Sequence, residues 1–92
     1  MTLEELRLKI DQVDSKLIEL YEERIAIAEN IAKAKIDMNK AVFDEAREKE
    51  KLQAVREKTV NEFNKDGVEE LFVFLMAKSK MRQEAVIKEV KQ

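Results

Sequence analysis

The feature that most constrains the fold is a single apolar stripe that follows helical spacing from Leu3 to Met38. Thr2 precedes it as a predicted N-cap, with Glu5 as its capping-box partner. The pattern therefore predicts one helix that ends at about Asp37 and is roughly 52 Å long. The stripe consists of Leu3, Leu6, Ile10, Val13, Leu17, Leu20, Ile27, Ile31 and Met38.

Such a helix is too long for one compact chain of this size. A globular chain of 92 residues has a diameter of about 30 Å, so part of the stripe would stay in water. A second subunit is the most economical source of apolar surface to cover it. The stripe therefore predicts an intertwined homodimer with paired long helices.

Two cations interrupt the stripe where apolar residues belong. Arg24 lies within roughly 10° of the centre of the apolar arc and Lys35 within about 30°, at 100° per residue. A structural salt bridge is the commoner explanation for a single arginine in such a place. Burying an unpaired charge is costly, however, so we expect an anionic group to meet these cations.

Composition predicts one all-helical domain, residues 1–92. The chain is 45% hydrophobic and 41% charged, with no proline and one glycine. Its net charge of -2 argues against a nucleic-acid partner, and no apolar run is long enough for a membrane span. Cysteine and histidine are absent, which excludes thiolate and imidazole chemistry. No targeting segment is recognised, so a cytoplasmic chain is predicted.

Two shorter helices are predicted after the long one. Asp44 is a predicted N-cap, and the helix after it should run to about Phe63. A short break that ends at Gly67, the single glycine, would follow. Asp66 is then the predicted cap of a third helix that reaches about Val90.

Each predicted helix interrupts its own apolar face with polar residues. These are Arg24 and Lys35 in the first, Glu48 in the second, and Ser79 and Gln83 in the third. Each of them alone has an ordinary structural explanation. Together they predict a pocket with two cations, a carboxylate, an amide and a hydroxyl, which suits a small dianion that carries a hydroxyl group. The set holds no metal site and no nucleophile, so catalysis there would depend on positioning and electrostatics.

Four sequence motifs together resemble the all-helical AroQ-type chorismate mutases over almost the whole chain. They are the opening LRLKIDQVDSKLIELYEER, then AKAK, then VFDEAREKE, and finally SKMRQ. The resemblance implies an isomerase that converts chorismate to prephenate by a pericyclic rearrangement. It implies no cofactor and no covalent intermediate. Chorismate is a dicarboxylate with a ring hydroxyl, which agrees with the pocket inferred from the residues.

The resemblance also implies which residues hold the two carboxylates. Arg7 would come from the partner subunit and grip one of them, and Arg24 would grip the other. Lys35 would bind a carboxylate as well, and Ser79 would touch one. Arg47 would support the carboxylate-binding cations. Independently, Arg7 lies roughly 100° around the first helix from Arg24, so the two cannot easily share a pocket in one chain.

The remaining implied roles concern the ring hydroxyl and the ether oxygen. Asp44 and Glu48 would accept the hydroxyl. Lys35 and Gln83 would donate to the ether oxygen, which gains negative charge as its bond breaks, so they would stabilise the transition state more than the ground state. Lys35, Gln83 and Glu48 are therefore the predicted catalytic residues.

Two other functions compete with this interpretation. An isochorismate-pyruvate lyase of the same fold would share the arginines and the lysine. Such lyases resemble the mutases but lack the carboxylate at the position of Glu48, so the glutamate here favours the mutase. A non-catalytic helical dimer, acting as a regulatory or scaffolding module, would leave Arg24 without a ligand. Assaying the purified chain with chorismate separates these possibilities.

Overall fold

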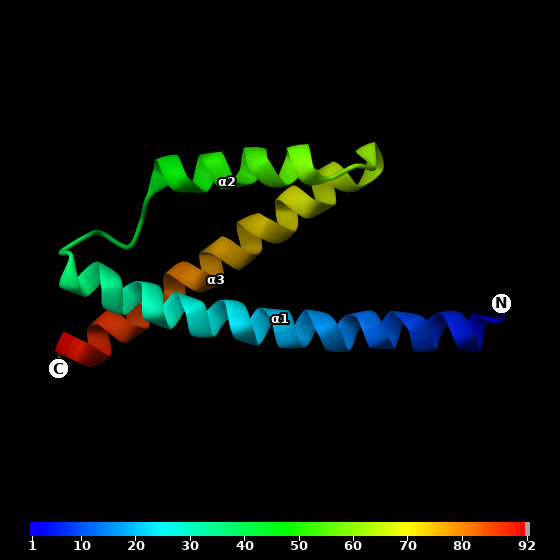
Figure 1. Cartoon of the computed structure of the whole chain (residues 1–92), viewed down its shortest axis with the longest axis horizontal. Helices are drawn as coiled ribbons and strands as arrows, with labels where there is room; N and C mark the ends of the chain where they lie inside the picture. Colours follow the sequence, from blue (N-terminus) through cyan, green and yellow to red (C-terminus); the bar gives the residue numbers. More distant parts are fainter. Residues whose placement is uncertain (92) are drawn as a thin grey trace.

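The computed structural model describes residues 1–91 and is built from helices (Figure 1). The all-helical prediction, with one long helix and two shorter ones, is confirmed. The elements are α1 (Leu3–Asp37), α2 (Glu45–Lys58), the 3-10 turn η1 (Glu62–Asn64) and α3 (Lys65–Lys91).

The ends of α1 lie where the sequence predicts them. The side chain of Thr2 accepts a hydrogen bond from the backbone N–H of Glu5 at 3.1 Å. At the other end, Asn39 adopts a left-handed conformation with φ 53°. The backbone N–H of Lys40 then donates to the carbonyl of Lys35 at 2.8 Å, and that of Asn39 donates to Ile36 at 3.1 Å. These two bonds form a Schellman motif, which ends the helix and turns the chain towards α2.

The predicted end of the second helix at Phe63 is wrong, because α2 ends at Lys58. The hydroxyl of Thr59 donates to the carbonyl of Val55 at 2.7 Å. Asn61 then accepts a hydrogen bond from the N–H of Phe63 at 2.9 Å and caps the turn η1. Local side-chain bonds of this kind compete with helix continuation. Phe63 consequently lies on the turn, 90% exposed.

The predicted cap of the third helix at Asp66 is also wrong. The helix α3 begins at Lys65, so Asp66 and Gly67 lie inside its first turn and no break ends there. Asp66 instead forms an ion pair with Arg56 of α2 at 2.9 Å, and Glu69 lies 3.2 Å from the same guanidinium. The hydrogen bond that Arg56 donates to Asp66 raises the pKa of Arg56 above its ordinary value. This pairing ties the end of α2 to the start of α3.

The helices form an elongated arrangement in which α3 packs against both α1 and α2. The N-terminal part of α1 extends past the ends of the other two helices (Figure 1). The described chain measures 54 × 26 × 14 Å. Its radius of gyration is 16.6 Å, whereas a compact chain of this length has about 12 Å. One chain therefore does not form a compact globule.

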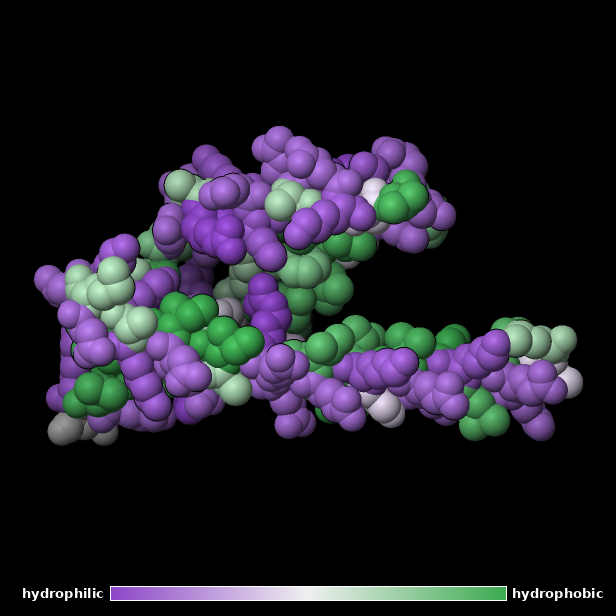
Figure 2. Space-filling model, viewed as in Figure 1, coloured by the Kyte–Doolittle hydropathy of each residue, from purple (hydrophilic) through white to green (hydrophobic). Residues whose placement is uncertain are grey.

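The buried core of residues 1–91 is small. Its buried apolar side chains are Ala28, Ala32, Val55 and Val86. The apolar stripe of α1 is not covered, since its residues are between 41% and 62% exposed. Figure 2 shows apolar side chains along the projecting part of α1. Within residues 1–91, no helix has the length and apolar character needed to cross a membrane.

Candidate active site

A cavity of about 440 Å³ lies between the three helices. This volume is typical of small-molecule sites, which range from roughly 300 to 1,000 Å³. Apart from Arg7, every residue predicted for the site lines this cavity. The full lining is Arg24, Ile27, Ala28, Ile31, Lys35, Val42, Asp44, Arg47, Glu48, Lys51, Met76, Ser79, Lys80 and Gln83.

The wall from α1 is one helix face with a cation at each end. Arg24, Ala28, Ile31 and Lys35 are spaced by three or four residues, so their side chains point the same way. Arg24 is half-buried, and its guanidinium donates to the carbonyl of Leu75 at 3.5 Å. The ammonium of Lys35 donates to the carbonyl of Val42 at 2.6 Å. This face therefore offers cationic donors on both sides of an apolar stretch.

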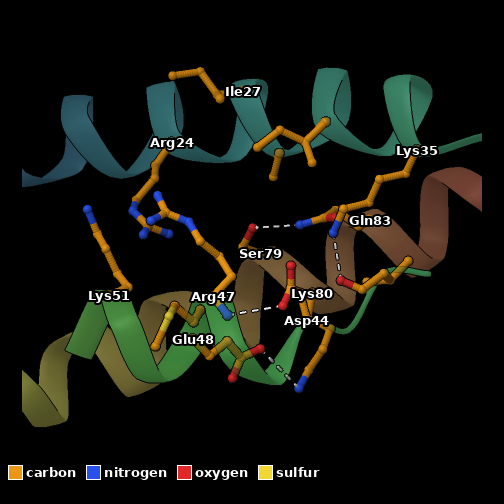
Figure 3. A pocket seen from close by; sticks show the side chains of 14 residues that line it. Arg24, Ile27, Lys35, Asp44, Arg47, Glu48, Lys51, Ser79, Lys80 and Gln83 are labelled. Carbon is orange, nitrogen blue, oxygen red and sulfur yellow. Dashed lines mark hydrogen bonds and ion pairs between the residues drawn. The ribbon is translucent and has the colours of Figure 1, made fainter. Parts of the chain in front are cut away.

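The wall from α2 begins at its N-cap. One carboxylate oxygen of Asp44, Oδ1, accepts from the backbone N–H of Arg47 at 3.0 Å, which leaves Oδ2 available. Figure 3 shows the guanidinium groups of Arg24 and Arg47 beside each other, with Lys51 pointing towards the same region. Arg24 and Lys51 both lie against the ring of Phe72, at 5.6 and 5.7 Å from its centre. Three cations thus gather at one end of the cavity.

The wall from α3 contributes a buried amide. Gln83 is only 7% exposed, and its Nε2 donates to the hydroxyl of Ser79 at 3.1 Å. Its carbonyl oxygen Oε1 is buried and has no hydrogen-bond partner. An unsatisfied buried acceptor costs free energy, so this amide is a candidate functional group of the cavity. Figure 3 places Gln83 near Lys35, at the end of the cavity away from Arg24.

The charge of the cavity is strongly positive. Its lining holds five cations and two carboxylates, although the whole chain has a net charge of -2. Among residues 1–91, Lys80 is the one cavity cation that forms an ion pair, with Glu48 at 3.7 Å. The other ion pairs of these residues involve side chains outside the cavity. Arg24, Lys35, Arg47 and Lys51 therefore have no acidic partner there. A cavity of this kind attracts a small anion.

Arg7 is the one predicted site residue that lies elsewhere. It is exposed on the projecting part of α1 and does not line the cavity. Arg24 is seventeen positions further along the chain, which corresponds to about 26 Å along the helix. Its side chain cannot span that distance. Its contribution to a site would therefore require a second subunit.

Two cavity residues, Lys51 and Lys80, were not predicted from the sequence. Lys51 follows Arg47 by four residues and shares its helix face, so the spacing could have identified it. Lys80 is next to Ser79 and three residues before Gln83, a spacing that also fits. Lysines are common on exposed helix faces, which hides this signal. Residues 1–91 contain no cluster of three acidic, histidine or cysteine side chains arranged to hold a metal ion.

Comparison with protein families gives a direct assignment. The family model described as chorismate mutase type II matches residues 6–84. Searches of curated proteins and of solved structures found no significant match. The matched span includes all the cavity-lining residues and Arg7. Motifs, fold and match agree, and the chain belongs to the chorismate mutase type II family.

Proposed function

We propose that the cavity between α1, α2 and α3 is the active site in which this chorismate mutase converts chorismate to prephenate. The observation that carries this proposal is the set of cations without acidic partners among residues 1–91, placed at two ends of one cavity. Chorismate carries two carboxylates, so it can neutralise both ends at once. The bound substrate is then held in the folded shape that the rearrangement needs.

The carboxylates are bound by different ends of the cavity. Arg24 and Arg47 receive one of them, with Lys51 beside them. Lys35 receives the other, and Ser79, which also lines the cavity, contacts it. Charge-assisted hydrogen bonds of this kind are strong and directional. They hold the two reacting carbon atoms of the substrate close together.

The ether oxygen is stabilised by Lys35 and Gln83. For this role the NH₂ group of Gln83 must face the substrate. Rotation of the amide brings Oε1 to the hydroxyl of Ser79, which can donate as well as accept, and frees Nε2 for the ether oxygen. The rotated amide therefore satisfies the buried oxygen and presents a donor to the developing negative charge.

The expected magnitudes agree with this arrangement. A rate gain of about 10⁶ requires about 8 kcal/mol of transition-state stabilisation. One preorganised donor at a developing oxyanion contributes about 2.7–4 kcal/mol. Lys35 and Gln83 can together supply most of the requirement, and positioning of the substrate supplies the rest. No general acid or base is needed, so the absence of histidine is no obstacle.

The ring hydroxyl of chorismate is bound by Asp44 and Glu48. Each of these carboxylates uses one oxygen within the protein, since Asp44 Oδ1 caps α2 and Glu48 Oε2 faces Lys80. The second oxygen of each remains available to accept a hydrogen bond from the ring hydroxyl. Glu48 also favours the mutase over the lyase of the same fold, which lacks a carboxylate there.

The working enzyme is a homodimer whose long helices pair. The exposed stripe of α1 and the small core of the single chain support this proposal. In the dimer, Arg7 of each subunit completes the partner's cavity and adds a further carboxylate ligand. We also propose a cytoplasmic location for this enzyme.

The test is to incubate the purified chain with chorismate and to identify the product by NMR. Lys35→Ala, prepared in the same way, controls for a contaminating mutase. Prephenate from the wild type and little from the variant supports the proposal. Equal activity of the two proteins, or release of pyruvate from isochorismate without any mutase activity, would overturn it.

A further inference from the structure

Lys80 connects three parts of the cavity wall. It lies on α3 and is half-buried. Its ammonium group is 3.7 Å from Oε2 of Glu48 on α2 and 4.5 Å from the ring centre of Phe43, in the loop before α2. The side chains of Lys80 and Glu48 are 33% and 31% exposed, so water screens this pair only in part. Figure 3 shows the two side chains meeting below the cavity.

The contact with Lys80 restricts the orientation of the Glu48 carboxylate. The ammonium group engages Oε2, which leaves Oε1 to accept a hydrogen bond from a ligand. We propose that Lys80 is a positioning residue that holds the Glu48 carboxylate in the orientation needed to accept the substrate hydroxyl. The inference rests on the proposed function, because it takes Glu48 to be the hydroxyl acceptor.

Two physical effects follow from the position of Lys80. Glu48 carries a negative charge into a site for a dianion, and like charges repel at short range. The ammonium group of Lys80 offsets that charge. In addition, Lys51 lies three residues after Glu48 on the same helix, where an ion pair can form. Without Lys80, the Glu48 carboxylate could turn to pair with Lys51. It would then no longer accept the substrate hydroxyl, and Lys51 would no longer be free to bind the substrate carboxylate.

A double-mutant cycle tests the inference. Lys80→Met removes the charge and keeps most of the side-chain volume, and Glu48→Gln removes the carboxylate. We expect Lys80→Met to lower kcat/KM about tenfold in the wild-type background. In the Glu48→Gln background the same change should lower it less than about twofold, because the group through which Lys80 acts is gone.

Matched variants separate positioning from structural roles. Lys80→Arg keeps the charge and should retain most of the activity. Lys78→Met is the control on the same helix, because Lys78 is also half-buried and lies 5.4 Å from the ring centre of Phe74, outside the cavity. It should leave kcat/KM unchanged. Circular dichroism and thermal unfolding check each fold, and Lys80→Gln replaces Lys80→Met if the latter does not fold.

The outcomes are distinct. Coupling between Lys80 and Glu48, together with a silent Lys78→Met, supports the inference. It is overturned if Lys80→Met has no effect, if its effect is the same in both backgrounds, or if it couples to Phe43→Leu and not to Glu48→Gln. A wild-type chain without mutase activity would instead refute the proposed function. Full activity of Glu48→Gln would refute the role of Glu48 and the inference with it.

Discussion

A mixture of two impaired variants should regain activity if each active site is shared between subunits. Arg7→Ala removes a cation that lies about 26 Å along α1 from Arg24 and outside its own cavity. Lys35→Ala removes a cation that lies inside the cavity. In a heterodimer of the two variants, one site combines an intact cavity with an intact Arg7. The other site lacks both residues.

The size of the recovery follows from these positions. Loss of Lys35 should lower kcat/KM about 10² to 10³-fold, as for a donor at an oxyanion. Loss of Arg7 removes a charge-assisted contact and should lower it about 10 to 150-fold. Random assortment of equal amounts makes about half of the dimers heterodimers, each with one of two sites restored. Activity should therefore return to about one quarter of wild type.

The assay is a chorismate consumption rate after the chains are unfolded together and refolded. Two different affinity tags allow the heterodimer to be purified and its amount measured. Mixing Arg24→Ala with Lys35→Ala is the control, because both residues belong to the cavity of the same chain and no heterodimer site is intact. The shared-site reasoning is refuted if purified heterodimers of the first pair stay inactive, or if the control pair recovers equally.

Three further predictions concern single residues. Gln83→Glu should be nearly inactive at about pH 8, where the carboxylate offers no proton to the ether oxygen, and should recover as the pH falls through its pKa, raised by the bound dianion. Equal kcat/KM of this variant and wild type at about pH 8 would contradict the role of Gln83. Gly67→Ala should raise the free energy of unfolding by about 1 kcal/mol, because Gly67 lies inside α3 and an added Cβ meets nothing within 4 Å; a lower Tm would show this reasoning to be wrong. Lys51→Met should raise KM more than it lowers kcat, since Lys51 lies beside the carboxylate end and away from the ether-oxygen donors, and steady-state kinetics with an unchanged KM would exclude a binding role.

The sequence alone determined the long helix and the residues that share its faces. The stripe and the cap at Thr2 are local patterns, and helical spacing converts them directly into positions in space. The same spacing placed Arg24 and Lys35 on one face, and the structure has both of them in the cavity. An uncovered stripe was also predictable, because the length of a helix is proportional to its number of residues.

The tertiary structure decided the features that depend on contacts between distant segments. Asp66 is a plausible helix cap by its sequence alone, but in the fold it lies inside α3 and pairs with Arg56 of α2. The contact of Lys80 with Glu48 likewise joins two helices. Periodicity describes one helix at a time, whereas the meeting of side chains from two helices depends on how those helices cross. The way the helices cross is set by packing along α3. Contacts between side chains of different helices, such as that of Lys80 with Glu48, therefore could not be predicted from the sequence.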